Sequence, residues 1–156
     1  MVKKEFDYYI FIDYSENLIG YLIIERAKIF EFISKISKFV HYKNVKHKSE
    51  YIHSIKKVIE KNRIYSYFLK NKIRKTIDTP EIYSDILEFI KKNYNCLIFI
   101  SVDNKQYSNF ERLVELIDGK NIKIIKENEL KVGSLEYKIS LVLDTLLNLK
   151  RIEQKA

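Results

Sequence analysis

The sequence has little cysteine, proline or glycine. Its 156 residues include one cysteine, one proline and three glycines. A single cysteine excludes an internal disulfide and a zinc finger, and it is typical of a reducing compartment. Three glycines leave no glycine-rich loop of the kind that holds nucleoside triphosphates. The cysteine, Cys96, lies inside an apolar run, so we predict that it is a small buried core residue.

Long hydrophobic runs are also lacking. No stretch approaches the roughly 20 apolar residues that a membrane-spanning helix needs. The opening residues, 1–5, are largely charged, and no apolar stretch of signal-peptide character follows them. We therefore expect a cytoplasmic protein without a membrane partner. Heavy use of Lys, Glu and Ile is thermophile-like, although an AT-rich genome gives the same bias.

The overall composition is that of a folded globular protein. Hydrophobic residues make up 46% of the chain and charged residues 32%, which argues against intrinsic disorder. The length suits one domain with its own core and is short for two. We expect a single domain over residues 1–156, with a basic helical excursion at about 41–78.

Positive charge is concentrated in the middle of the chain. Between Lys43 and Lys75 there are eleven Lys or Arg residues and two acids, a net charge of +9, whereas the whole chain carries +8. The remainder therefore sums to −1. Nucleic acid is the commonest partner of such a segment. A solvated helical face and an acidic protein partner are the alternatives.

The first half of the chain predicts a hairpin followed by helices. Tyr8–Asp13 and Leu18–Glu25 have the alternation of strands, and Ser15-Glu16-Asn17 between them is a turn. Residues 27–40 fit either a helical stripe or a third strand, because periodicity does not separate the two. In the basic segment we predict one helix from an N-cap at Ser49 to Asn62, and another over Ile64–Ile77.

The second half of the chain alternates helices and strands. Capping residues mark the helix starts and a continuous apolar run marks a buried strand. The predicted elements are a helix from Thr79 to Asn93, a strand over Cys96–Val102, a helix from Ser108 to Gly119, a strand over Asn121–Lys126 and a helix opening at Gly133-Ser134. This order predicts an α/β fold, with a mixed central sheet, an N-terminal hairpin and flanking helices.

Two aspartates stand at the ends of predicted strands. Asp13 ends the first strand and Asp103 ends the buried strand. Residues just beyond the carboxyl ends of parallel strands line the ligand crevice of an open sheet. Close carboxylates stay ionised most easily around a divalent cation, which predicts a Mg²⁺ or Mn²⁺ site. Asp144 or, as its substitute, Glu136 would complete the site from the last helix.

Each of these acids also has an ordinary structural explanation. An aspartate after a strand is common turn chemistry. An acid in a first helical turn, such as Glu136, interacts favourably with the helix dipole without any site. The catalytic hypothesis therefore depends on the topology that brings the acids together.

The arrangement resembles the ribonuclease H-like fold. Residues Ile12-Asp13-Tyr14-Ser15-Glu16-Asn17 are similar to the Ile-Asp-Glu-Ser-Gly-Asn opening of a family of uncharacterised prokaryotic ribonuclease H-like proteins, except at Tyr14 and Glu16. Residues 121–144 are similar to that family's last strand and aspartate-bearing helix. The resemblance implies two-metal phosphodiester chemistry, with Asp13, Asp103 and Asp144 holding the cations.

The basic segment is the second candidate site. Lysine and arginine neutralise phosphates, and interleaved aromatic rings stack on unpaired bases. The aromatic residues Tyr67 and Phe68 fit core positions better than stacking platforms. The candidate nucleic-acid-binding residues are Lys43, Lys46, Lys48, Lys56, Lys57, Lys70, Lys72, Arg74 and Lys75.

The leading hypothesis is a ribonuclease H-like domain that binds nucleic acid and cleaves phosphodiester bonds with Mg²⁺ or Mn²⁺. The alternatives are a non-catalytic nucleic-acid-binding module on the same fold and a protein that docks an acidic partner through its basic helices. The choice between DNA and RNA stays open, as does the oligomeric state.

Overall fold

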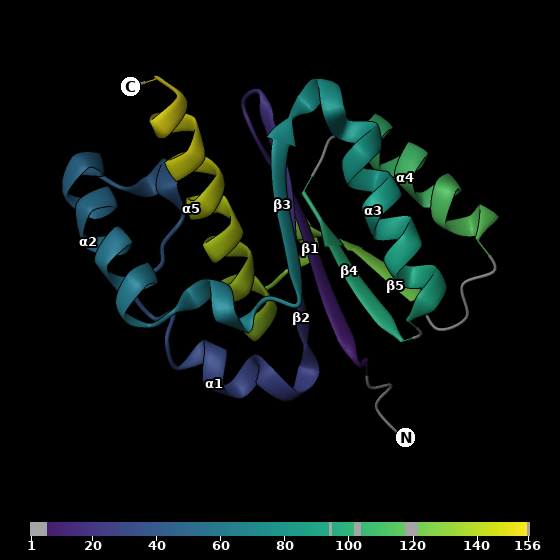
Figure 1. The fold of residues 1–156 in the computed structure, drawn as a ribbon, viewed down its shortest axis with the longest axis horizontal. Helices are drawn as coiled ribbons and strands as arrows, with labels where there is room; N and C mark the ends of the chain where they lie inside the picture. Colours follow the sequence, from purple (N-terminus) through teal and green to yellow (C-terminus); the bar gives the residue numbers. More distant parts are fainter. Residues whose placement is uncertain (1–5, 94, 102–103, 118–121, 156) are drawn as a thin grey trace.

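A five-stranded mixed sheet forms the centre of the structure (Figure 1). The structure is a computed structural model that describes residues 6–93, 95–101, 104–117 and 122–155. The strands are β1 (Tyr8–Ser15), β2 (Leu18–Glu25), β3 (Lys70–Lys75), β4 (Cys96–Ile100) and β5 (Ile122–Lys126). Their order across the sheet is β3-β2-β1-β4-β5. Strand β2 is antiparallel to both of its neighbours, whereas β1, β4 and β5 are parallel.

Helices cover both faces of the sheet (Figure 1). One layer contains α1 (Ile29–Ile33), α2 (Lys48–Lys61) and α5 (Leu135–Lys155), and the other contains α3 (Thr79–Lys92) and α4 (Asn104–Leu116). Alternate side chains of β1 face the two layers, so Phe11 packs in the core under α5 while Ile10 and Ile12 pack in the core under α3. The predicted mixed α/β architecture is confirmed.

Helix α5 lies close to β1 and β2 because β2 carries a glycine beneath it. A Cβ atom at Gly20 would lie 3.0 Å from Leu147 of α5 and 3.0 Å from Ile73 of β3. Such contacts are tighter than ordinary packing, so a larger residue would push the helix or the edge strand away. Gly20 pairs with Asp13 of β1, and the close approach therefore occurs beside a candidate site residue.

The predicted helix over Ile64–Ile77 is wrong. A short 3-10 helix, Ile64–Tyr67, is followed by the edge strand β3. Tyr67 and Phe68 are buried, as predicted, and fix the entry into the strand. Side chains of β3 then alternate between the two layers, since Ile73 packs with the core under α5 while Lys72 meets acids of α3. The side chains of residues 70–75 therefore alternate with the period of two of a strand, because their partners lie on opposite faces of the sheet.

Other element boundaries differ from the sequence predictions by a few residues. Of residues 27–40, the first half is helical, with a 3-10 turn at Arg26–Lys28 and helix α1, and residues 34–40 form turns without a third strand. Helix α2 begins at Lys48 after an N-cap at His47, so Ser49 is not the cap. Helix α4 begins at Asn104, which places the predicted capping box at Ser108 inside the helix.

Two predicted helix starts contain the expected signals. Pro80 lies in the first turn of α3, although the N-cap is Asp78 and the Thr79 hydroxyl donates to the carbonyl of Thr76 at 2.6 Å. At the start of α5, Ser134 Oγ accepts a hydrogen bond from the Tyr137 amide at 3.2 Å. None of the helices in the described ranges has both the length and the apolar character that crossing a membrane requires.

Cys96 is buried at the start of β4, as predicted, with 0% of its surface exposed. Burial, with a smaller effect from Asp7, raises the pKa of its thiol to about 12. The reactive thiolate is therefore scarce at neutral pH. We expect a thiol reagent at pH 8 to leave the folded protein unmodified and to label one thiol per chain in guanidinium chloride. Rapid stoichiometric labelling of the folded protein would contradict this placement.

Candidate functional site

The carboxyl ends of β1 and β4 lie side by side. The two strands are parallel, with Ile12 opposite Ile100. The pairing continues one residue further, because the Ser101 amide donates to the Ile12 carbonyl at 2.9 Å. This is the topology on which the predicted pairing of Asp13 and Asp103 depended. Asp103 itself lies outside the described residues.

Asp13 occupies the carboxyl-terminal part of β1 and faces α5. It alternates with Phe11 and Ser15 on the layer that contains α5. Only 8% of Asp13 is exposed. Its Oδ1 atom accepts a hydrogen bond from the Tyr14 amide at 2.8 Å. The carboxyl group of Asp13 is therefore held near the strand end, away from bulk solvent.

Asp144 is buried in the middle of α5, with 7% exposed. Its Oδ2 atom accepts a hydrogen bond from the Tyr42 amide at 2.8 Å and lies 3.8 Å from His41 Nδ1. Burial raises the pKa of Asp144, against the hydrogen bond from Tyr42 and the charges of His41 and Arg151. The surrounding groups therefore offset only part of the cost of burying the ionised carboxylate. A bound cation would offset the rest.

Hydrogen bonds connect the Asp144 face of α5 to the end of β1. Asn148, one turn after Asp144, donates to the Asp144 carbonyl at 2.8 Å and has its amide nitrogen 3.5 Å from Asp144 Oδ1. Its side-chain oxygen accepts hydrogen bonds from Ser15 at 3.2 Å and from Arg151 at 2.7 Å. Arg151 also lies 3.5 Å from Glu16 in the hairpin turn. Asp13 and Asp144 therefore share one layer, between β1 and α5.

Glu136 lies elsewhere on the same helix. It is in the first turn of α5 and is half-buried. Eight residues separate it from Asp144, a distance of about 12 Å along a helix axis. Of the two acids predicted as alternatives, Asp144 is the one that belongs to the network at the end of β1.

The donor chemistry fits a hard divalent cation, although the described residues do not complete a site. Two buried carboxylates, those of Asp13 and Asp144, are the oxygen ligands that Mg²⁺ and Mn²⁺ prefer. Within the described ranges, no three His, Cys, Asp or Glu side chains group closely enough to hold a metal ion. The predicted third carboxylate is Asp103, outside those ranges.

Sequence reasoning missed the polar residues that surround Asp144. Ser140, Asp144 and Asn148 are buried polar residues four positions apart in α5. This spacing, which places them on one face, is the signal that would have identified Asn148. The contact with Tyr42 had no such signal, because it joins positions 102 residues apart. Arg151 Nε is buried and has no hydrogen-bond partner among the described residues.

No protein-family model matches the chain, and no curated protein matches it. Among solved structures it is similar to the ribonuclease H2 of Pyrococcus horikoshii OT3, with 12% identity and a TM-score of 0.54 over 94% of this chain and 72% of that one. The chain has a ribonuclease H-like fold. The RNase HII of Archaeoglobus fulgidus, solved in a complex with PCNA, is similar over the same shares, with 9% identity and a TM-score of 0.49.

The similarity to the Pyrococcus horikoshii ribonuclease H2 confirms the fold that the sequence resemblance implied. The strand order β3-β2-β1-β4-β5 belongs to this ribonuclease H-like fold, with Asp13 on its central strand. At such low identity the similarity shows the fold alone. The opening motif and the family of uncharacterised proteins stay predictions.

On the ribonuclease H-like fold, the basic segment divides into two groups with different surroundings. Lys43, Lys46, Lys56 and Lys57 are exposed around α2, and no described acid lies within ion-pair distance of them. Lys48, at the start of α2, donates to the Val45 carbonyl at 2.9 Å and lies over the Tyr42 ring. This group therefore carries positive charge that remains available to a partner.

The second group lies on β3 and is largely paired with α3. Arg74 Nε donates a hydrogen bond to Glu81 Oε2 at 3.0 Å. Lys72 Nζ lies 2.6 Å from Asp85 Oδ2. Lys70 is 4.0 Å from the same Asp85. These three cations are partly neutralised by acids that follow the segment in sequence, so its net charge overstates its attraction for phosphate. Lys75, at the end of β3, is exposed.

Asp85 joins β3 and β2 to α3. It accepts hydrogen bonds from Lys72 and, at 2.9 Å, from the Tyr21 hydroxyl. Burial raises the pKa of Asp85, but these hydrogen bonds and the charges of Lys70 and Lys72 outweigh it, so the pKa is held below its ordinary value. Ionised Asp85 therefore stabilises the fold above the ordinary carboxyl pKa, and this stabilisation is lost as the pH falls through the lowered value.

We expect Asp85→Asn to lower the free energy of unfolding by about 1–3 kcal/mol at pH 7. Urea denaturation at pH 7, 5 and 3 measures the free energy of unfolding of both proteins. The difference in this free energy between Asp85→Asn and the wild type should become smaller toward pH 3. Glu88→Gln, on the exposed side of the same helix, is the control with little expected change. A difference that stays constant with pH would contradict the role of the ionised carboxylate.

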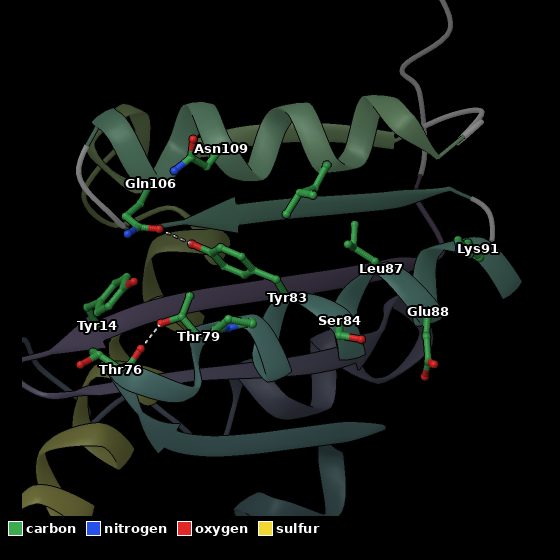
Figure 2. A pocket seen from close by; sticks show the side chains of 12 residues that line it. Tyr14, Thr76, Thr79, Tyr83, Ser84, Leu87, Glu88, Lys91, Gln106 and Asn109 are labelled. Atoms are coloured by element: carbon green, nitrogen blue, oxygen red, sulfur yellow. Dashed lines mark hydrogen bonds between the residues drawn. The ribbon is translucent and has the colours of Figure 1, made fainter.

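A large cavity lies on the opposite face of the sheet from the two aspartates. Its volume is about 1060 Å³. The cavity lies between α3 and α4 (Figure 2). Tyr83 crosses it and donates to Gln106 at 3.4 Å, while Tyr14 lines the end near β1. Neither Asp13 nor Asp144 lines it. In this ribonuclease H-like fold, Tyr14 and Asp13 thus face opposite layers.

Proposed function

We propose that the chain binds nucleic acid and cleaves phosphodiester bonds at a metal site held by Asp13 and Asp144, with Asp103 as the third ligand. The observation that carries the proposal is the placement of two buried carboxylates in one layer at the carboxyl end of β1, in a ribonuclease H-like fold. Burial of charged groups at a strand end is costly for stability alone, so a role in holding a cation explains it.

The chain's own groups have separable tasks in this proposal. The Tyr42 amide holds Asp144 Oδ2, and Oδ1, which has only the long 3.5 Å contact with Asn148 Nδ2, would be the cation ligand. Asn148 fixes the orientation of that carboxylate and ties it to β1. Bound Mg²⁺ or Mn²⁺ would supply an activated water and stabilise the leaving oxygen.

Nucleic acid would be held by the exposed lysines around α2. If Lys43, Lys46, Lys56 and Lys57 each neutralise one phosphate, the logarithm of the binding constant should fall with the logarithm of salt concentration with a slope of about −3. A fluorescence-anisotropy titration at several salt concentrations measures this slope. If binding does not weaken with added salt, the lysines do not neutralise phosphates. That result would favour the alternative in which the chain docks an acidic protein partner.

A non-catalytic nucleic-acid-binding module is the second candidate. The observation in its favour is Tyr14, which stands where the resembling family has glutamate and lines the cavity on the other side of the sheet. The chain therefore offers one carboxylate fewer at this strand end than the family motif. On this reading the basic surface is functional and the aspartates are structural.

A cleavage assay separates the two candidates. Labelled DNA, RNA and hybrid substrates would be incubated with the full chain in Mg²⁺, Mn²⁺ or EDTA. The nuclease proposal expects cleavage of at least one substrate with either metal and none with EDTA. Salt-dependent binding without cleavage in any metal would establish the binding module and reject the nuclease.

A further inference from the structure

A hollow lined by lysines lies between the turn that follows α1 and the second half of α2. Its volume is about 370 Å³. Lys35 and Lys38 line it from the turn, and Lys57 and Lys61 line it from α2. Ser34, Ser37 and Ser54 add hydroxyl groups, and no acid is among the lining residues. The hollow is thus strongly cationic and already formed as a concave site.

The two walls are fixed in place by the core beneath them. In the turn, Ile36 and Phe39 are buried, which directs the intervening and preceding lysines outward. In α2, the buried Ile55 anchors the helix on the opposite side from Lys57. Asn62 at the end of α2 donates its side-chain N–H to the Lys35 carbonyl at 3.1 Å. The walls therefore hold their positions without a ligand.

Among the described residues, no acid lies within ion-pair distance of the four lysines. Lys57 and Lys61 are spaced by four residues on one helix face, an arrangement of like charges that disfavours the helix. The nearest acids in sequence have other surroundings, since Glu60 lines a different hollow and Glu31 interacts with Tyr67. An anion in the hollow would relieve the repulsion among the four lysines.

The number of cations favours a phosphate monoester over a backbone phosphodiester. A phosphodiester carries one charge and lies along a convex strand, which a flat basic face can hold. A phosphate monoester carries a charge of about −1.5 to −2 at neutral pH and three acceptor oxygens. A concave site with four ammonium groups and three hydroxyls matches such a terminal group.

We propose that this hollow binds the terminal phosphate of a nucleic-acid strand. That the phosphate belongs to a nucleic-acid strand rests on the proposed function. A free nucleotide carries the same terminal phosphate and is the other ligand that the test must distinguish. Bound there, a strand end would be held beside the exposed lysines of α2.

The test compares one oligonucleotide with and without a 5′ or 3′ phosphate, by anisotropy at fixed salt. We expect about tenfold tighter binding of one phosphorylated form. The double variant Lys38→Gln, Lys57→Gln should remove this preference and keep weaker binding to both forms. Lys91→Gln, Lys92→Gln, which removes the same charge from the exposed end of α3 in the other layer, should retain the preference.

A second measurement does not depend on binding to a strand. Adenosine 5′-monophosphate would be titrated into ¹⁵N-labelled protein, and shifts in the amide signals of residues 34–38 and 54–62 are expected. If neither oligonucleotide binds, the proposed function fails. Shifts at the hollow would then identify the free nucleotide as the source and overturn the strand assignment. Equal binding of all oligonucleotide forms, or a preference that survives Lys38→Gln, Lys57→Gln, overturns the inference while the nuclease proposal stands.

Discussion

Asp13→Asn is expected to lower metal-dependent cleavage by at least about hundredfold. The substitution keeps the size of the side chain and the oxygen that accepts the Tyr14 amide, but it removes the negative charge. A divalent cation held by carboxylates loses one of its charged ligands, so the rate falls more than the folding stability does. Initial rates against Mg²⁺ concentration measure the effect.

The control for Asp13→Asn is Glu115→Gln, an equal change of charge on the exposed part of α4. It should cleave at the wild-type rate. Thermal unfolding of both variants in EDTA shows whether the fold is intact. If folded Asp13→Asn keeps half of the wild-type activity, the reaction takes place at another site or belongs to a contaminant.

Phe32→Ala is expected to lower the free energy of unfolding by about 3–5 kcal/mol. Phe32 is fully buried in the layer of α1, α2 and α5. Its ring lies 5.2 Å from that of Tyr67 and 5.8 Å from that of Phe68, between centroids. Removing the ring leaves a cavity where the chain enters β3, and urea denaturation monitored by circular dichroism measures the loss.

Phe30 offers a matched control for this substitution. It is in the same short helix but is 84% exposed. Phe30→Ala should change the free energy of unfolding by less than about 0.5 kcal/mol. Similar losses in the two variants would mean that α1 does not pack on the sheet as described.

The parts of the fold that the sequence predicted have local causes. The hairpin follows from alternation and a two-residue turn, and β4 follows from a continuous apolar run. Strand β3 was mistaken for a helix because its causes are distant in sequence. Lys72 and Arg74 meet acids of α3, and Ile73 packs against the core under α5. The local sequence of β3 does not indicate these distant partners, so its propensity alone did not predict a strand.

The candidate site was predictable to a similar degree. Strand ends identified Asp13, and the topology that would bring Asp103 beside it is present. The choice between Asp144 and Glu136 required the register of α5 on the sheet, which depends on the close approach over Gly20. The basic surface was overestimated, since charges of β3 are balanced by α3. The turn residues Lys35 and Lys38 precede the segment that net charge singled out.

The central claim is that Asp13 and Asp144 hold a divalent cation between β1 and α5. The most direct test is a titration of ¹⁵N-labelled protein with Mn²⁺, because the paramagnetic ion broadens the NMR signals of nuclei near it. We expect the amide signals of residues 13–15 and 144–148 to broaden first, and this selectivity to be lost in Asp144→Asn. Broadening that begins at other acids, or that Asp144→Asn leaves unchanged, would contradict the claim.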